Sequence, residues 1–172
     1  MDYEFTLKFQ LADDDCNHDE LVERLGAAGC DDALLGIGQP GRIGLQFTRD
    51  AASANDALTS AVMDVRRAVP TARLIEAAPD FVGLTEAADM MGMTRQNLRK
   101  LMVSNPSFPL PVHEGSAGVW HLSDILGWLH AKGYAVERNV AQVALVTREL
   151  NATVEAAQMA RGRQHELAQL VA

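Results

Sequence analysis

The chain has 172 residues, of which 48% are hydrophobic and 22% are charged, and its formal net charge is −8. A composition of this kind is typical of one or two small globular domains. No apolar run reaches the roughly 20 residues that a membrane-spanning helix needs, and the first residues lack the basic and apolar segments of a signal peptide. We therefore expect a cytoplasmic protein that makes no contact with a membrane.

The first 78 residues follow the order strand, helix, strand, strand, helix, strand. Side chains alternate between apolar and polar in the expected strands, whereas apolar residues recur at helical spacing in the expected helices. The strands are expected at residues 3–11, 33–37, 42–48 and 72–77, and the helices at residues 18–28 and about 54–68. The order predicts an α+β fold that begins with a ferredoxin-like βαββαβ domain, residues 1–78, with both helices on one face of an antiparallel sheet. We expect this domain to serve in dimerisation or sensing.

The acidic residues are concentrated in this first domain. Residues 1–80 hold 7 Lys and Arg against 15 Asp and Glu, whereas residues 81–134 hold 4 of each. Arg95, Arg99 and Lys100, three of the four basic residues of the middle segment, lie within six positions of one another. We expect the acidic domain to suppress non-specific attraction to phosphate groups, so that any contact with nucleic acid falls to the middle segment.

No pattern in the sequence is typical of a catalytic or metal site. The two cysteines, Cys16 and Cys30, form no CxxC pair, and the five histidines show no ligand spacing. The consecutive Asp13, Asp14 and Asp15 fit a solvated acidic loop better than a cation site. No serine has an identifiable His and Asp partner. We expect two reduced thiols, no cofactor, no metal and no enzymatic activity.

Residues 84–103 have the layout of a helix-turn-helix. A short helix with small residues at Ala87 and Ala88 ends at Gly92, and Thr94 is the expected N-cap of a second helix. Leu98, with Leu101 and Met102, would face the interior. The polar side chains left outward include donors that read bases: Arg pairs with guanine, and Asn or Gln with adenine. The predicted DNA contacts here are Thr94, Arg95, Gln96, Asn97, Arg99 and Lys100, although such a face alone is also typical of a solvated helix.

The segment after this helix predicts a wing and a third helix. Residues 105–111 are a proline-rich exit, residues 113–118 a hairpin tip and residues 119–122 a return strand, followed by a helix over 123–129. We expect Trp120 in this strand to belong to the core.

Three stretches, taken together, resemble a known family. They are Leu84 to Ala88 with Gly92 and Thr94 to Leu98, then Phe108 to Val112, then Trp120 to Leu129. With this set, residues 82–133 resemble the excisionase and phage-regulator winged helix-turn-helix, a relative of the MerR-type DNA-binding domain. The resemblance implies that the second helix enters the major groove and that the wing touches the DNA backbone or minor groove. The chain lacks the basic residues that the family usually carries around the wing strand, which leaves His113, Ser116 and His121 as candidate wing contacts.

The last part of the chain, residues 136–171, is expected to form one long amphipathic helix. Apolar residues approximate a 3-4 spacing, with Thr147 and Arg161 as interruptions. The helix would either form a coiled-coil dimer or pack on its own protein. The spaced residues are Val136, Val140, Val143, Leu150, Val154 and Ala157.

These observations favour a sequence-specific double-stranded DNA-binding transcriptional regulator that acts as a homodimer, with its winged domain at residues 82–134. One alternative is an antitoxin-like protein, whose acidic first domain neutralises a partner protein while the winged domain autoregulates. Another is a phage DNA-packaging recognition subunit.

Overall fold

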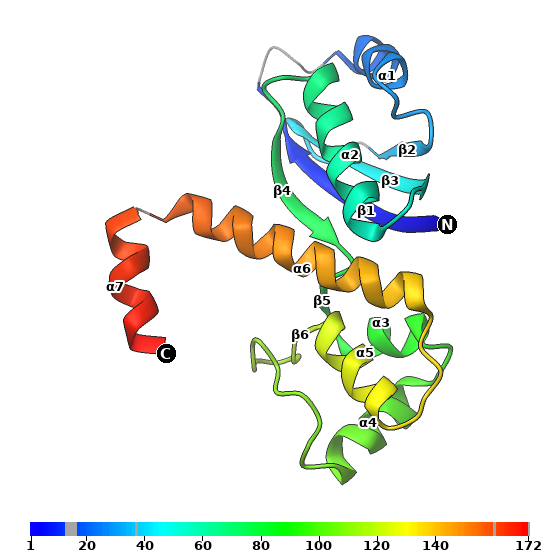
Figure 1. Ribbon diagram of the computed structural model, residues 1–172, viewed down its shortest axis with the longest axis vertical. Helices are drawn as coiled ribbons and strands as arrows, with labels where there is room; N and C mark the ends of the chain where they lie inside the picture. Colours follow the sequence, from blue (N-terminus) through cyan, green and yellow to red (C-terminus); the bar gives the residue numbers. More distant parts are fainter. Residues whose placement is uncertain (13–16, 37, 160, 172) are drawn as a thin grey trace.

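A four-stranded antiparallel sheet with helices on one face forms one end of the molecule (Figure 1). The computed structural model describes residues 1–12, 17–36, 38–159 and 161–171. The strands lie in the order β2-β3-β1-β4. They and the two helices between them follow the predicted succession: β1 (Asp2–Gln10), α1 (His18–Ala27), β2 (Ala33–Gly36), β3 (Arg42–Asp50), α2 (Ala54–Ala68) and β4 (Arg73–Ala78). The α+β class is therefore confirmed.

The alternation of β1 explains which face of the sheet is covered. Phe5, Leu7 and Phe9 are buried, while Glu4 and Lys8 on the other face are exposed. Burial of a large apolar side chain contributes about 1.5–3 kcal/mol, so this alternation strongly favours one register. The apolar sides of α1 and α2 join the same core, as predicted for two helices on one face.

Some predictions fall on residues that the structure does not describe. The acidic loop at Asp13, Asp14 and Asp15, the thiol of Cys16 and the expected strand end at residue 37 lie outside the described residues. Cys30 is described, and it is a free and buried thiol. Burial raises the pKa of Cys30 to about 11, so this thiol is protonated near neutral pH.

A second core lies at the other end of the molecule. It is built from α3 (Leu84–Met90), α4 (Arg95–Ser104) and α5 (Leu122–Ala131), with a small sheet of β5 (Phe81–Val82) and β6 (Trp120–His121). The predicted return strand, residues 119–122, has two partners. Its Trp120 and His121 pair with Val82 and Phe81, and a single bridge between His113 and Val119 closes the wing hairpin.

The expected single helix over residues 136–171 is two helices, α6 (Arg138–Gln158) and α7 (Arg161–Val171). The helix α6 crosses between the two ends of the molecule, and α7 turns away from its far end (Figure 1). Val143 belongs to the core of the sheet, and the next residue, Ala144, belongs to the second core. Of the two alternatives for this segment, α6 therefore shows packing on its own protein.

Polar residues of α6 hold the junction between the two ends. Asn151 accepts a hydrogen bond from the amide of Ala77 at 2.7 Å and donates to the carbonyl of the same residue at 2.8 Å. Thr147, which interrupts the apolar spacing, donates to the carbonyl of Pro79 at 2.6 Å. An interruption in the apolar pattern thus marks the place where α6 meets backbone polar groups, which need partners when buried.

No helix in the described part of the chain is long and apolar enough to cross a membrane.

Candidate nucleic-acid interface

The turn between α3 and α4 determines how α4 is presented. Gly92 has a φ of +61°, a conformation that residues with a side chain rarely adopt. Ala87 and Ala88 of α3 are fully buried, which lets α4 approach closely, and the fully buried Leu98 anchors α4 to this core. The side-chain oxygen of Thr94 accepts a hydrogen bond from the amide of Asn97 at 3.2 Å and caps α4, as predicted.

The six residues predicted to contact DNA in this region are all exposed. They are Thr94, Arg95, Gln96, Asn97, Arg99 and Lys100. Within the described residues, the charged groups of Arg95, Arg99 and Lys100 make no hydrogen bond and no ion pair. These cations are therefore available to a ligand without the loss of an existing pair, which would otherwise reduce the gain from binding.

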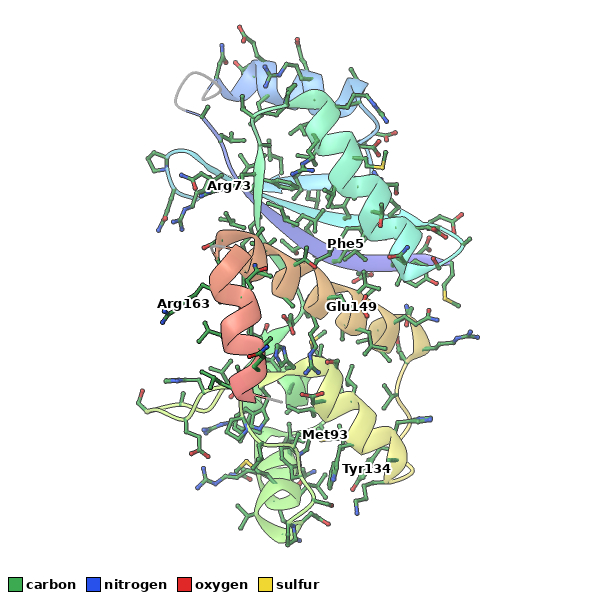
Figure 2. The ribbon with its side chains drawn as sticks, turned by 60° about the vertical axis from the view of Figure 1, so that its left-hand side comes forward. Phe5, Arg73, Met93, Tyr134, Glu149 and Arg163 are labelled. Atoms are coloured by element: carbon green, nitrogen blue, oxygen red, sulfur yellow. The ribbon has the colours of Figure 1, made fainter. Side chains whose placement is uncertain are left out.

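The helical period divides the exposed residues between the centre and the flank of α4. Leu98 points to the core, so Gln96 and Lys100, two residues away on either side, lie on the opposite side of the helix, with Arg99 beside them. Asn97 lies on a flank instead. It lines a hollow of about 320 Å³ beside α4, together with Met93 and Tyr134, which are labelled at this end of the molecule in Figure 2.

The predicted wing residues do not share one environment. His113 and Ser116 are exposed on the hairpin, where a ligand can reach them. His121 is largely buried instead: its Nδ1 lies 2.6 Å from a carboxylate oxygen of Asp80, and its ring packs against Phe81 with centroids 4.9 Å apart. The strand pairing with β5 places His121 beside Asp80 and Phe81, away from the exposed hairpin that carries His113 and Ser116.

The rest of the wing is apolar rather than basic. Residues 105–121 contain no Lys or Arg, and Leu110 and Val112 are 86% and 53% exposed. Trp120 belongs to the core, as predicted: it is 6% exposed and its indole donates to the carbonyl of Pro109 at 3.0 Å. A Cβ at position 118 would lie 2.4 Å from this indole, so the glycine there lets the hairpin rest on the ring. This wing therefore offers no lysine or arginine to a phosphate group, and its exposed candidate contacts are His113 and Ser116.

A larger hollow, of about 450 Å³, lies between the sheet and the helices α3 and α6. Its charged lining residues are Glu4, Glu86 and Glu137. Three carboxylates repel phosphate, so this hollow does not extend the surface of α4. No group of His, Cys, Asp and Glu among the described residues is arranged to hold a metal ion.

Two exposed residues of α4, Val103 and Ser104, were not predicted to contact DNA. Val103 is 71% exposed, and it lies on the same side of the helix as Gln96 and Lys100. The helical spacing from Leu98 is the signal that places it there.

No family model matches the chain, and no curated protein and no solved structure matches it.

Proposed function

We propose that the protein is a sequence-specific double-stranded DNA-binding transcriptional regulator. In this proposal, residues 82–133 form a winged helix-turn-helix and α4 enters the major groove. The observation that carries it is the outward side of α4, where exposed and unpartnered cations lie next to Gln96 on a helix anchored by Leu98. An α-helix fits the major groove, where Arg pairs with guanine and Gln with adenine.

The charge distribution supports the same proposal. Net negative charge belongs to residues 1–80, and the sheet that these residues form lies at the end of the molecule away from α4 (Figure 1). An acidic part far from the helix weakens non-specific attraction to phosphate and leaves base contacts to decide where the protein binds. The strand order β2-β3-β1-β4 supports the proposal that residues 1–78 are a ferredoxin-like domain.

The proposed homodimer needs a surface other than the apolar side of α6. Val143 and Ala144 are buried by the two cores, and Val154 packs against the sheet core. The helix α7 offers Leu170 and Val171, which are 76% and 87% exposed. We therefore assign dimerisation to α7. Light scattering would show a dimer for the full chain and a monomer for a chain that ends at Met159, whereas an unchanged mass would contradict this assignment.

The DNA-binding proposal is tested by selecting bound sites from a random duplex library and titrating the best site. Arg95→Ala and Arg99→Ala should each weaken specific binding by about 1–3 kcal/mol, because each removes one base or phosphate contact. Arg66→Ala, which removes an exposed arginine of α2, is the matched control and should bind as the wild type does. If no site is enriched, or if both α4 variants bind normally, the proposal is wrong.

An antitoxin-like function is a second candidate, favoured by one observation. The exposed side of α1 carries Asp19, Glu20 and Glu23, which form an acidic surface suited to a basic partner protein. Co-expression with the product of the neighbouring gene would test it. If the complex is lost when Asp19 is replaced by Asn and Glu20 and Glu23 by Gln, the antitoxin-like function is supported. If no complex forms with the wild type, this function is wrong.

A further inference from the structure

Val103 is the one apolar residue on the outward side of α4. It follows Gln96 by seven positions and Lys100 by three, which is the spacing of residues on one side of a helix. Its side chain is 71% exposed, and it does not belong to either core. The outward side of α4 is thus a stripe of polar donors that ends in an apolar side chain.

A valine at this position contributes little to folding. A β-branched residue is a weaker helix former than Ala, Lys or Arg. The last turn of a helix favours a cation that offsets its partial negative charge, and α4 has no basic residue there. Stability alone would therefore favour Lys or Arg at position 103, and the exposed valine is open to contact with a ligand.

The major groove contains one group that the polar residues of α4 cannot read. Guanine presents acceptors, which suit Arg and Lys, and adenine presents a donor and an acceptor, which suit Gln, whereas thymine presents a C5-methyl group that is recognised by apolar contact. Val103 supplies two methyl groups on the side of α4 that would face the bases.

The helical rise fixes how far apart these contacts lie. Seven residues separate Gln96 from Val103, and a rise of about 1.5 Å per residue places them roughly 10 Å apart along the axis. This separation exceeds the spacing of about 3.4 Å between successive base pairs, so the two side chains would meet different base pairs.

We propose that Val103 determines specificity by contacting the C5-methyl group of a thymine at a different base pair from the one that Gln96 contacts. This inference rests on the proposed function, because it requires α4 to lie in the major groove. It adds a thymine to a site that the polar residues alone would not require.

The test replaces each thymine of the selected site, one at a time, with deoxyuridine, which lacks only the C5-methyl group. Fluorescence anisotropy of the full-length protein would then give the dissociation constant for each duplex. Loss of one buried methyl contact should weaken wild-type binding about fourfold at one thymine. Val103→Ala should bind the thymine and deoxyuridine duplexes equally. Val22→Ala, which changes a valine of α1 with 54% exposure, should keep the wild-type difference.

The outcomes separate this inference from the function on which it rests. If the wild type enriches no site at all, the proposed function fails and the inference fails with it. If the wild type enriches a site but is insensitive to every deoxyuridine, or if Val103→Ala keeps the fourfold difference, Val103 does not read thymine and DNA recognition by α4 still stands.

Discussion

The sheet and the helix α4 use arginine in opposite ways. Arg49 of β3 is 7% exposed and binds Asp32 through Nε at 2.7 Å, Asp64 through Nη1 at 2.8 Å and the carbonyl of Gly29 through Nη2 at 2.8 Å. Arg95 and Arg99 of α4 are exposed and have no partner among the described residues. An arginine whose guanidinium is hydrogen-bonded within the fold stabilises the structure. An arginine whose guanidinium has no such partner is available to a ligand.

The partners of Arg49 explain its structural role. Gly29 and Asp32 lie between α1 and β2, and Asp64 lies on α2, so one side chain of β3 connects the sheet to both helices. Hydrogen bonding to Asp32 raises the pKa of Arg49 above its already high ordinary value. A cation so fully bound has no donor left for DNA.

Replacing Arg49 should have the largest effect on stability. Arg49→Ala leaves the carboxylates of Asp32 and Asp64 partly buried without their cation, which should lower the free energy of unfolding by about 3 kcal/mol. Urea denaturation would measure the change, with Arg66→Ala as the exposed control. An effect of Arg49→Ala no greater than that of the control would contradict the structural role.

Replacing Asn151 should have the second largest effect on stability, because its side chain bonds to buried groups at the junction between the two ends of the molecule. It is 5% exposed, and besides its two bonds to Ala77 it donates to a carboxylate oxygen of Asp80 at 2.8 Å. Asn151→Ala leaves these buried groups without a partner and should lower the free energy of unfolding by about 2 kcal/mol. Glu149→Ala, on the exposed side of the same helix (Figure 2), should change it by less than about 0.5 kcal/mol. Equal effects in urea would show that the junction is not held by Asn151.

The raised pKa of the Cys30 thiol should make the stability of the protein depend on pH. Burial, followed by the charge of Asp64, raises its pKa from 9.0 to about 11. The unfolded chain loses this proton near pH 9 while the folded protein keeps it, so the free energy of unfolding should fall as pH rises from about 9 to 11. Comparison with Cys30→Ala, both in a Cys16→Ser background, isolates the effect. Parallel pH profiles of the two proteins would contradict the raised pKa.

The smallest effect on stability should come from α4. Because Arg99 and Lys100 have no partners among the described residues, Arg99→Ala and Lys100→Ala should each change the free energy of unfolding by less than about 0.5 kcal/mol. A loss of 2 kcal/mol or more in urea would mean that these side chains support the fold, and the contrast with Arg49 would disappear.

Local patterns predicted the elements well because their causes are local. The alternation in β1 and the side-chain cap at Thr94 each depend on residues close in sequence, and the structure shows both. The outward exposure of the predicted α4 residues likewise follows from the position of Leu98 in the helical period.

Contacts between distant residues were not predictable in this way. The contact of His121 with Asp80 was not predicted, because Asp80 lies 41 positions earlier in the chain and no periodicity links the two residues. Thr147 was predicted only as an interruption of the apolar spacing. Its partner is the backbone carbonyl of Pro79, and the sequence pattern does not indicate which backbone groups need a partner. The break between α6 and α7 lies directly before Arg161, where the apolar spacing is interrupted, but an interruption of this kind at Thr147 does not end the helix.

The most direct test of the account is a salt titration of binding to the selected site by the wild type and by the Arg95→Ala/Arg99→Ala double variant. Fluorescence anisotropy would give the dissociation constant at each salt concentration. We expect the double variant to bind at least about tenfold more weakly, and its salt dependence to have a slope smaller by up to about 2, because two cations no longer meet DNA. Equal affinity and equal slope for the two proteins would contradict the claim that α4 binds DNA.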